Sequence, residues 1–203
     1  MGSIRLIVGK YKPNILGISM PKTISSRLDN TFLKAGYSII CCKNSGVSAY
    51  RIWFFLHKSV VFPILVREND QIVTCNCLES GNKIHCSIIY AHNNPIDRRT
   101  LWRQIQDLAN EISDPWIIVG DFNSILNAED KIGPMSNIST IAEFTECIEG
   151  DCLTEINLLG AKFTWYMRHL TGMGARRIDM AFANNDSLAF WKSISCVTLA
   201  KHN

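Results

Sequence analysis

The sequence predicts a globular fold of the α/β or α+β class, in which β-sheets are covered by helices. Strand-length apolar runs dominate the first half of the chain, and apolar residues recur at helical spacing after Asn94-Pro95. A length of 203 residues corresponds to one domain, residues 1–203. The 47% of hydrophobic residues against 19% of charged ones supplies a sizeable core, which excludes a disordered chain.

The first half is predicted as a short helix followed by an antiparallel meander. The segment Ile4–Val8 is weakly helical, and Pro13 ends that helix before a buried strand over Asn14–Ser19. Turn clusters such as Lys43-Asn44-Ser45-Gly46 separate the strands that follow, which are rich in Ile, Val, Phe and Trp. These strands are expected at Tyr37–Cys42, Ala49–Leu56, Val60–Val66, Gln71–Leu78 and Lys83–Tyr90.

The second half is predicted to mix helices with strands. Asn94 as N-cap and Pro95 as first helical residue open an amphipathic helix, whose apolar residues are Leu101, Ile105, Leu108 and Ile112. A capping box of Thr140 and Glu143 opens another helix that runs through Ile148. The remaining elements are expected at Trp116–Val119, Phe163–Tyr166, Ile178–Phe182 and Ser193–Leu199 as strands and at Asn185–Trp191 as a short helix.

Charge, hydropathy and cysteines narrow the class of protein. A formal net charge of +3 neither requires nor excludes a nucleic-acid partner. The chain has no apolar run of membrane-spanning length and no secretory segment, so an intracellular protein, nuclear or cytoplasmic and without a membrane partner, is expected. The cysteines are interpreted as core residues rather than zinc ligands, because Cys75 and Cys77 share one face of a strand.

The sharpest chemical feature follows the strand at Trp116–Val119, which ends in Gly120-Asp121-Phe122-Asn123. Side chains two residues apart can face the same cleft. There an Asp can orient or deprotonate a water and an Asn can bind a phosphate oxygen without adding negative charge. A turn that merely ends the strand remains the alternative, since Gly, Asp and Asn are ordinary turn residues.

Polar residues at two other strand ends join this pattern. Tyr90 and Asn93 follow an apolar strand, and Arg176 and Arg177 precede Asp179. Guanidinium groups match the oxygens of a phosphate in geometry. Taken singly, each piece also fits a structural role: a Tyr that caps the core, an Asn that begins a loop and a solvated pair of arginines.

Together these motifs resemble the endonuclease/exonuclease/phosphatase superfamily, and more closely the endonuclease domain of plant LINE-type (non-LTR) retroelements. The resemblance is carried by Tyr90 with Arg99 and Leu101-Trp102, by Trp116–Asn123, by Gly160 with Phe163-Thr164-Trp165, and by Arg177-Ile178-Asp179. It implies a four-layer α/β sandwich, with two mixed β-sheets face to face and helices outside.

The resemblance also implies roles for individual residues. Asp121 corresponds to the residue that activates water, Asn123 and Tyr90 to phosphate-binding residues, and Asp179 to the carboxylate that orients a catalytic His. Asn93, Arg176 and Arg177 are expected to bind substrate. Mg2+ is the cofactor of such enzymes and DNA their substrate, and a parent polyprotein with a reverse transcriptase domain is a possible context.

The departures from the family pattern predict a catalytically impaired domain. Met20 stands where the family places the metal-binding Glu, and a thioether is a poor ligand for Mg2+. The family's first strand and its terminal Ser-Asp-His are expected outside this chain, so the fold should be incomplete at both termini. A non-catalytic nucleic-acid-binding remnant and a non-functional relic are the alternatives.

Overall fold

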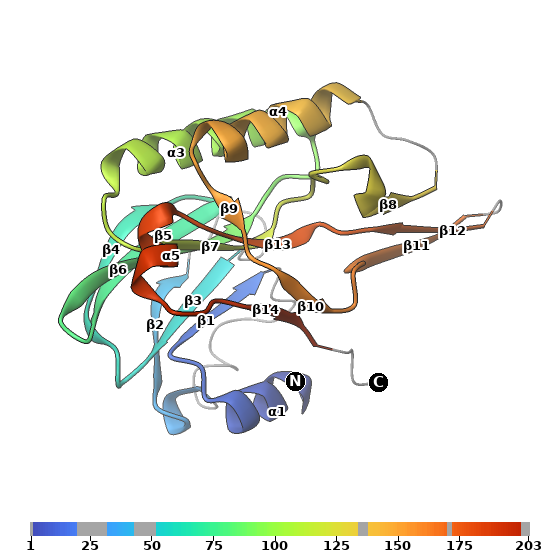
Figure 1. The fold of residues 1–203 in the computed structure, drawn as a ribbon. Helices are drawn as coiled ribbons and strands as arrows, with labels where there is room; N and C mark the ends of the chain where they lie inside the picture. The colour runs from blue at the N-terminus through green and yellow to red at the C-terminus, as the bar shows by residue number, and fades with distance from the viewer. Residues whose placement is uncertain (1, 20–31, 43–51, 134–137, 170–171, 200–203) are drawn as a thin grey trace.

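The computed structural model describes residues 2–19, 32–42, 52–133, 138–169 and 172–199 and shows four stacked layers (Figure 1). Helices α3 (Pro95–Glu111) and α4 (Ile138–Gly150) form one outer layer. Two layers of strands lie beneath them, and α1 (Gly2–Tyr11) covers the opposite side. The four-layer α/β sandwich predicted from the sequence is therefore confirmed.

A six-stranded mixed sheet forms the layer under α3 and α4. Its order is β4-β5-β6-β7-β13-β9, and β6 and β7 are parallel whereas the other neighbours are antiparallel. Helix α3 makes the crossover between the two parallel strands. The strands are β4 (Val61–Glu68), β5 (Ile72–Glu79), β6 (Asn82–Tyr90), β7 (Trp116–Asp121), β13 (Asp179–Ala183) and β9 (Thr154–Glu155).

The second strand layer is divided within the described residues, whereas one mixed sheet was expected. An antiparallel sheet has the order β1-β3-β2, and a separate parallel pair joins β10 to β14. Val119 of β7 packs against two hydrophobic clusters, one that includes Phe54 of β3 and one against which Cys196 of β14 also packs. The strands are β1 (Ile15–Ser19), β2 (Tyr37–Cys42), β3 (Ile52–His57), β10 (Leu158–Gly160) and β14 (Cys196–Thr198).

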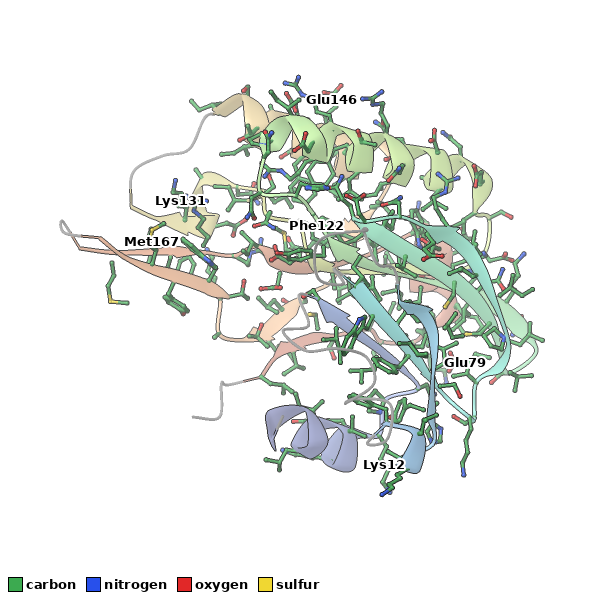
Figure 2. The ribbon with its side chains drawn as sticks, turned by 180° about the vertical axis from the view of Figure 1, so that it is seen from behind. Lys12, Glu79, Phe122, Lys131, Glu146 and Met167 are labelled. Atoms are coloured by element: carbon green, nitrogen blue, oxygen red, sulfur yellow. The ribbon has the colours of Figure 1, made fainter. Side chains whose placement is uncertain are left out.

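A small three-stranded sheet projects from the body of the molecule. It contains β11 (Trp165–His169), β12 (Gly172–Arg176) and β8 (Lys131–Ile132), which follows the 3-10 helix η1 (Ala128–Asp130). Figure 2 places Lys131 and Met167 on this projection, away from the core. The sequence did not predict β12, because its glycines have low strand propensity.

An aromatic cluster between the helices and the six-stranded sheet anchors the core. Phe122 and Phe144 are fully buried, with ring centroids 5.2 Å apart, and Trp102 stacks on Phe144. Figure 2 shows Phe122 near the centre of the molecule. Because Phe122 directly follows β7, its burial fixes the loop in which Asp121 and Asn123 lie.

The helix boundaries agree in part with those expected. Asn94 caps α3 by accepting a hydrogen bond from the Ile96 amide at 3.1 Å, as predicted. Helix α4 begins at Ile138, before Thr140, and Glu143 pairs with Arg99 of α3 instead of closing a capping box. The helix α5 spans Asn185–Phe190, and no helix within the described residues is long and apolar enough to cross a membrane.

Replacing Gly120 with alanine should destabilise the fold strongly. Gly120 has φ +150°, and a Cβ there would lie 2.1 Å from the carbonyl oxygen of Ile89 in the neighbouring strand. We expect Gly120→Ala to lower the free energy of unfolding by about 2–4 kcal/mol, measured by urea denaturation. Gly81→Ala is the control, because Gly81 also has positive φ but no atom within 4 Å of its Cβ position. Equal losses in both variants would contradict a steric role for Gly120.

Candidate active site

Three of the predicted site residues lie side by side at one edge of the six-stranded sheet. Tyr90 of β6 is the register partner of Asp121 in β7, and Asp121 is the register partner of Asp179 in β13. Partners on neighbouring strands share a face of the sheet. That face is turned toward the second strand layer, because Tyr90 packs against residues of β3. The structure therefore brings Tyr90, Asp121 and Asp179 together.

Asp121 lies in an environment that disfavours its negative charge. Burial raises the pKa of its carboxyl to about 6, and the charge of Asp179 acts in the same direction. Opposing this rise in pKa, the backbone amide of Asn123 donates a hydrogen bond to Asp121 Oδ1 at 2.8 Å, and the positive charge of Arg98 lies within electrostatic range. The result is a carboxylate that can exchange a proton near neutral pH.

Asn123 connects the loops that follow β6 and β7. Its backbone has φ +47°, a conformation that Asn adopts more readily than most residues. Its side-chain amide donates to the carbonyl oxygen of Ala91 at 2.7 Å. This hydrogen bond holds Asn123 against the loop that carries Asn93.

A pocket of about 170 Å³ lies beside these loops, next to the acidic pair. Three predicted residues, Asn93, Asn123 and Arg176, contribute to its walls. Arg98 of α3, which was not among the site residues predicted from the sequence, also lines the pocket. A signal was available, because Arg98 falls on the same helical stripe as Leu101 and Ile105 and is a charged residue on an otherwise apolar face.

Arg177 has a different position from the one expected, and its assignment to substrate binding is corrected. Its guanidinium is buried and makes two hydrogen bonds to Asp130, at 2.8 and 3.0 Å, and further ones to Glu155. Asp130 is itself 2% exposed. The ion pairs connect η1 with β9 and β13, so Arg177 supports the sheet from inside the protein.

The acidic pair has the type of donor atom that Mg2+ prefers. Carboxylate oxygens suit Mg2+, which proteins often bind through one or two carboxylates together with substrate phosphates. Asp121 and Asp179 fit that pattern, although the described residues contain no cluster of three His, Cys, Asp or Glu that could hold an ion. Met20, at the position expected for the metal-binding Glu, lies outside the described residues.

A comparison with protein families identifies the family to which this fold belongs. Residues 17–199 match the model of the Endonuclease/Exonuclease/phosphatase family, and the chain belongs to that family. No curated protein sequence matches it.

Solved structures extend the comparison at the level of the fold. The chain is similar to the endonuclease domain of TRAS1, a telomere-specific non-LTR retrotransposon, with TM-score 0.72 and 14% identity, covering 93% of this chain and 80% of that one. A hairpin-deletion mutant of beta toxin from Staphylococcus aureus has TM-score 0.67 and 12% identity, and the match covers 98% of this chain and 85% of the toxin chain. The Neisseria 3′ phosphatase NExo, bound to a product DNA hairpin, has TM-score 0.64 and 14% identity, and the match covers 93% of this chain and 82% of the NExo chain.

Breaking the buried ion pairs of Arg177 should destabilise the protein. Arg177→Met leaves Asp130 charged and buried without its partner, so we expect the free energy of unfolding to fall by about 3–5 kcal/mol in chemical denaturation. Arg99→Met is the matched control, because Arg99 also forms a bidentate pair with Glu143 but is exposed. The control should lower the free energy of unfolding far less, because solvent screens an exposed ion pair. A small effect at Arg177 would contradict its structural assignment.

Asp121 should make stability fall as pH rises from about 4 to about 6. Its folded pKa is raised above the unfolded value, so the folded state binds more protons in this window and loses that advantage as the carboxyl ionises. We expect Asp121→Asn to raise the free energy of unfolding by about 1–2 kcal/mol at pH 7.5 and by little at pH 4. Denaturation at both pH values measures this, with exposed Asp107→Asn as control. A gain that is independent of pH would contradict the assignment.

Proposed function

We propose that this chain carries an Mg2+-dependent phosphodiester-cleaving site of the DNA endonuclease type, with impaired catalysis. The observation that carries the proposal is the register of three strands, which sets Asp121 between Tyr90 and Asp179. The family to which the chain belongs comprises endonucleases, exonucleases and phosphatases. Asp121, Asn123, Tyr90 and Asp179 are the proposed catalytic residues.

Each residue has a distinct part in the proposed reaction. Asp121, with its pKa raised to about 6, accepts a proton from the attacking water. The Tyr90 hydroxyl and the Asn123 amide bind oxygens of the phosphate without bringing negative charge toward it. Mg2+, when bound, would neutralise charge on the phosphate. Asp179 supplies a second carboxylate at the same edge and raises the pKa of Asp121.

The proposed impairment rests on Met20, which occupies the place of the metal-binding Glu in the sequence motif. A thioether adds neither charge nor a hard oxygen ligand, so affinity for Mg2+ should be low. Cleavage by the natural chain is therefore expected to be weak or undetectable.

DNA as the substrate is supported by the fold neighbours. TRAS1 is a retrotransposon endonuclease, and NExo was solved with a DNA hairpin. A parent polyprotein with a reverse transcriptase domain, and a nuclear or cytoplasmic location, would suit such an activity. We include in this proposal that the chain derives from a plant LINE-type retroelement, which its sequence motifs resemble.

Non-catalytic binding of nucleic acid is the second candidate function. The basic pocket beside the acidic pair favours it, since Arg98 and Arg176 can hold phosphate whether or not cleavage follows. A relic without function predicts neither binding nor cleavage.

Nicking of supercoiled plasmid in Mg2+ tests the proposal. The natural chain should show little activity, Met20→Glu should strengthen Mg2+ binding, and any nicking gained in Met20→Glu should disappear in the Met20→Glu, Asp121→Ala double variant. Salt-dependent plasmid binding by all three proteins without nicking would support the binding candidate instead. Robust nicking by the natural chain, lost on Asp121→Ala, would overturn the proposed impairment, and nicking that survives Asp121→Ala would overturn the proposed site.

A further inference from the structure

The pocket beside the acidic pair has a strongly one-sided charge. Arg98 and Arg176 contribute to its walls, and among the residues that the structure describes no Asp or Glu does. The other polar walls come from amides and hydroxyls, among them Asn93, Asn123 and Thr140. A concave surface with two cations and neutral hydrogen-bonding groups is complementary to an anion.

Arg98 is held in place from inside the protein. Its side chain is 5% exposed, and Nη1 donates to the backbone carbonyl oxygens of His92 and Asn93 at 3.1 and 2.9 Å. Within the described residues, Arg98 has no carboxylate within salt-bridge distance. Glu143 and Asp121 act on Arg98 only at longer range, and they offset part of the cost of burying its charge. An anion bound in direct contact with the guanidinium would offset more of that cost.

Arg176 approaches the same pocket from the projecting sheet. Its guanidinium lies over the ring of Trp165, 5.2 Å from the centroid, which fixes the long side chain. The positive charges of Arg98 and Arg176 are close enough to repel each other. An anion between them would relieve that repulsion.

The size of the pocket limits what it can hold. Ligand sites for small molecules usually measure roughly 300–1,000 Å³, whereas this pocket measures about 170 Å³. It accommodates a group such as a phosphate but not a nucleobase with its sugar. Asp121, Asp179 and Tyr90 do not contribute to its walls, whereas Asn123 does, so the pocket adjoins the proposed cleavage site without coinciding with it.

We propose that this pocket binds a phosphate of the DNA strand next to the one under attack, with Arg98 and Arg176 as its ligands. The inference rests on the nucleic-acid substrate proposed above. Arg98 also positions the loop that carries Asn93, through its two carbonyl contacts. The pocket would thereby set the register of the strand relative to Asp121.

Titration with inorganic phosphate tests the pocket without requiring cleavage. The side-chain Nε–H signals of Arg98 and Arg176 in ¹⁵N NMR spectra, assigned with Arg98→Lys and Arg176→Gln, should shift saturably. The signal of Arg103, an exposed arginine on the same helix, should move far less. Comparable movement of all three signals, or no saturation, would overturn the proposal.

A second measurement connects the pocket with DNA. Arg176→Gln should weaken plasmid binding about fivefold to tenfold and reduce the slope of log affinity against log salt by about 1, whereas Arg103→Gln should change neither. Arg176 lies partly exposed on β12, so its variant should fold even if an Arg98 variant does not. An unchanged slope in Arg176→Gln would refute the pocket. Neither measurement depends on nicking. The nicking assay can therefore refute the proposed cleavage function without refuting phosphate binding in the pocket, and these two measurements can refute the pocket without refuting cleavage.

Discussion

The close approach of β6 and β7 at Gly120 is the constraint on which the site depends. With no side chain at this position, the carbonyl oxygen of Ile89 can lie where a Cβ would otherwise be. The parallel register is thereby kept up to the end of both strands, and the Ala91 amide continues it by donating to the Asp121 carbonyl oxygen at 2.8 Å. Tyr90 and Asp121 therefore lie directly opposite each other at the ends of β6 and β7. The Phe122 amide similarly donates to Ile178, which extends the pairing toward β13.

Arg176 and Arg177 are adjacent in the sequence but have different surroundings in the structure. Arg176 lies at the end of β12, where its guanidinium reaches the basic pocket over Trp165. Arg177 turns inward and forms ion pairs with Asp130 and Glu155. The first is partly exposed and able to meet a ligand, whereas the second holds η1 and β9 against β13. Two neighbouring arginines thus have different surroundings, one at a pocket and one in a buried ion-pair network, because they face opposite sides of the chain.

The sequence predicted the fold and the position of the acidic pair better than it predicted the arginines. Apolar strands that end in Tyr90 and Asp121 carry a local signal, and the helical spacing of Leu101 and Ile105 located α3. The role of Arg177 depends on Asp130 and Glu155, which are distant in sequence and follow no motif. The strand β12 was missed for a different reason: its glycines have low strand propensity, and its pairing with β11 and β8 supplies the stability that the local sequence lacks.

Groups of opposite charge lie near Asn123, so that in the proposed function binding and cleavage would use different side chains. Asp121 and Asp179 are register partners at the sheet edge and repel a phosphate, whereas Arg98 and Arg176 line the neighbouring pocket and attract one. A phosphate can approach the acidic side only if a cation compensates the carboxylates. Under the proposed function that cation would need ligands besides these two carboxylates, and Met20, where the family pattern has a glutamate, adds no charge. In the proposed function, phosphate binding in the basic pocket would therefore not require the cation that cleavage requires.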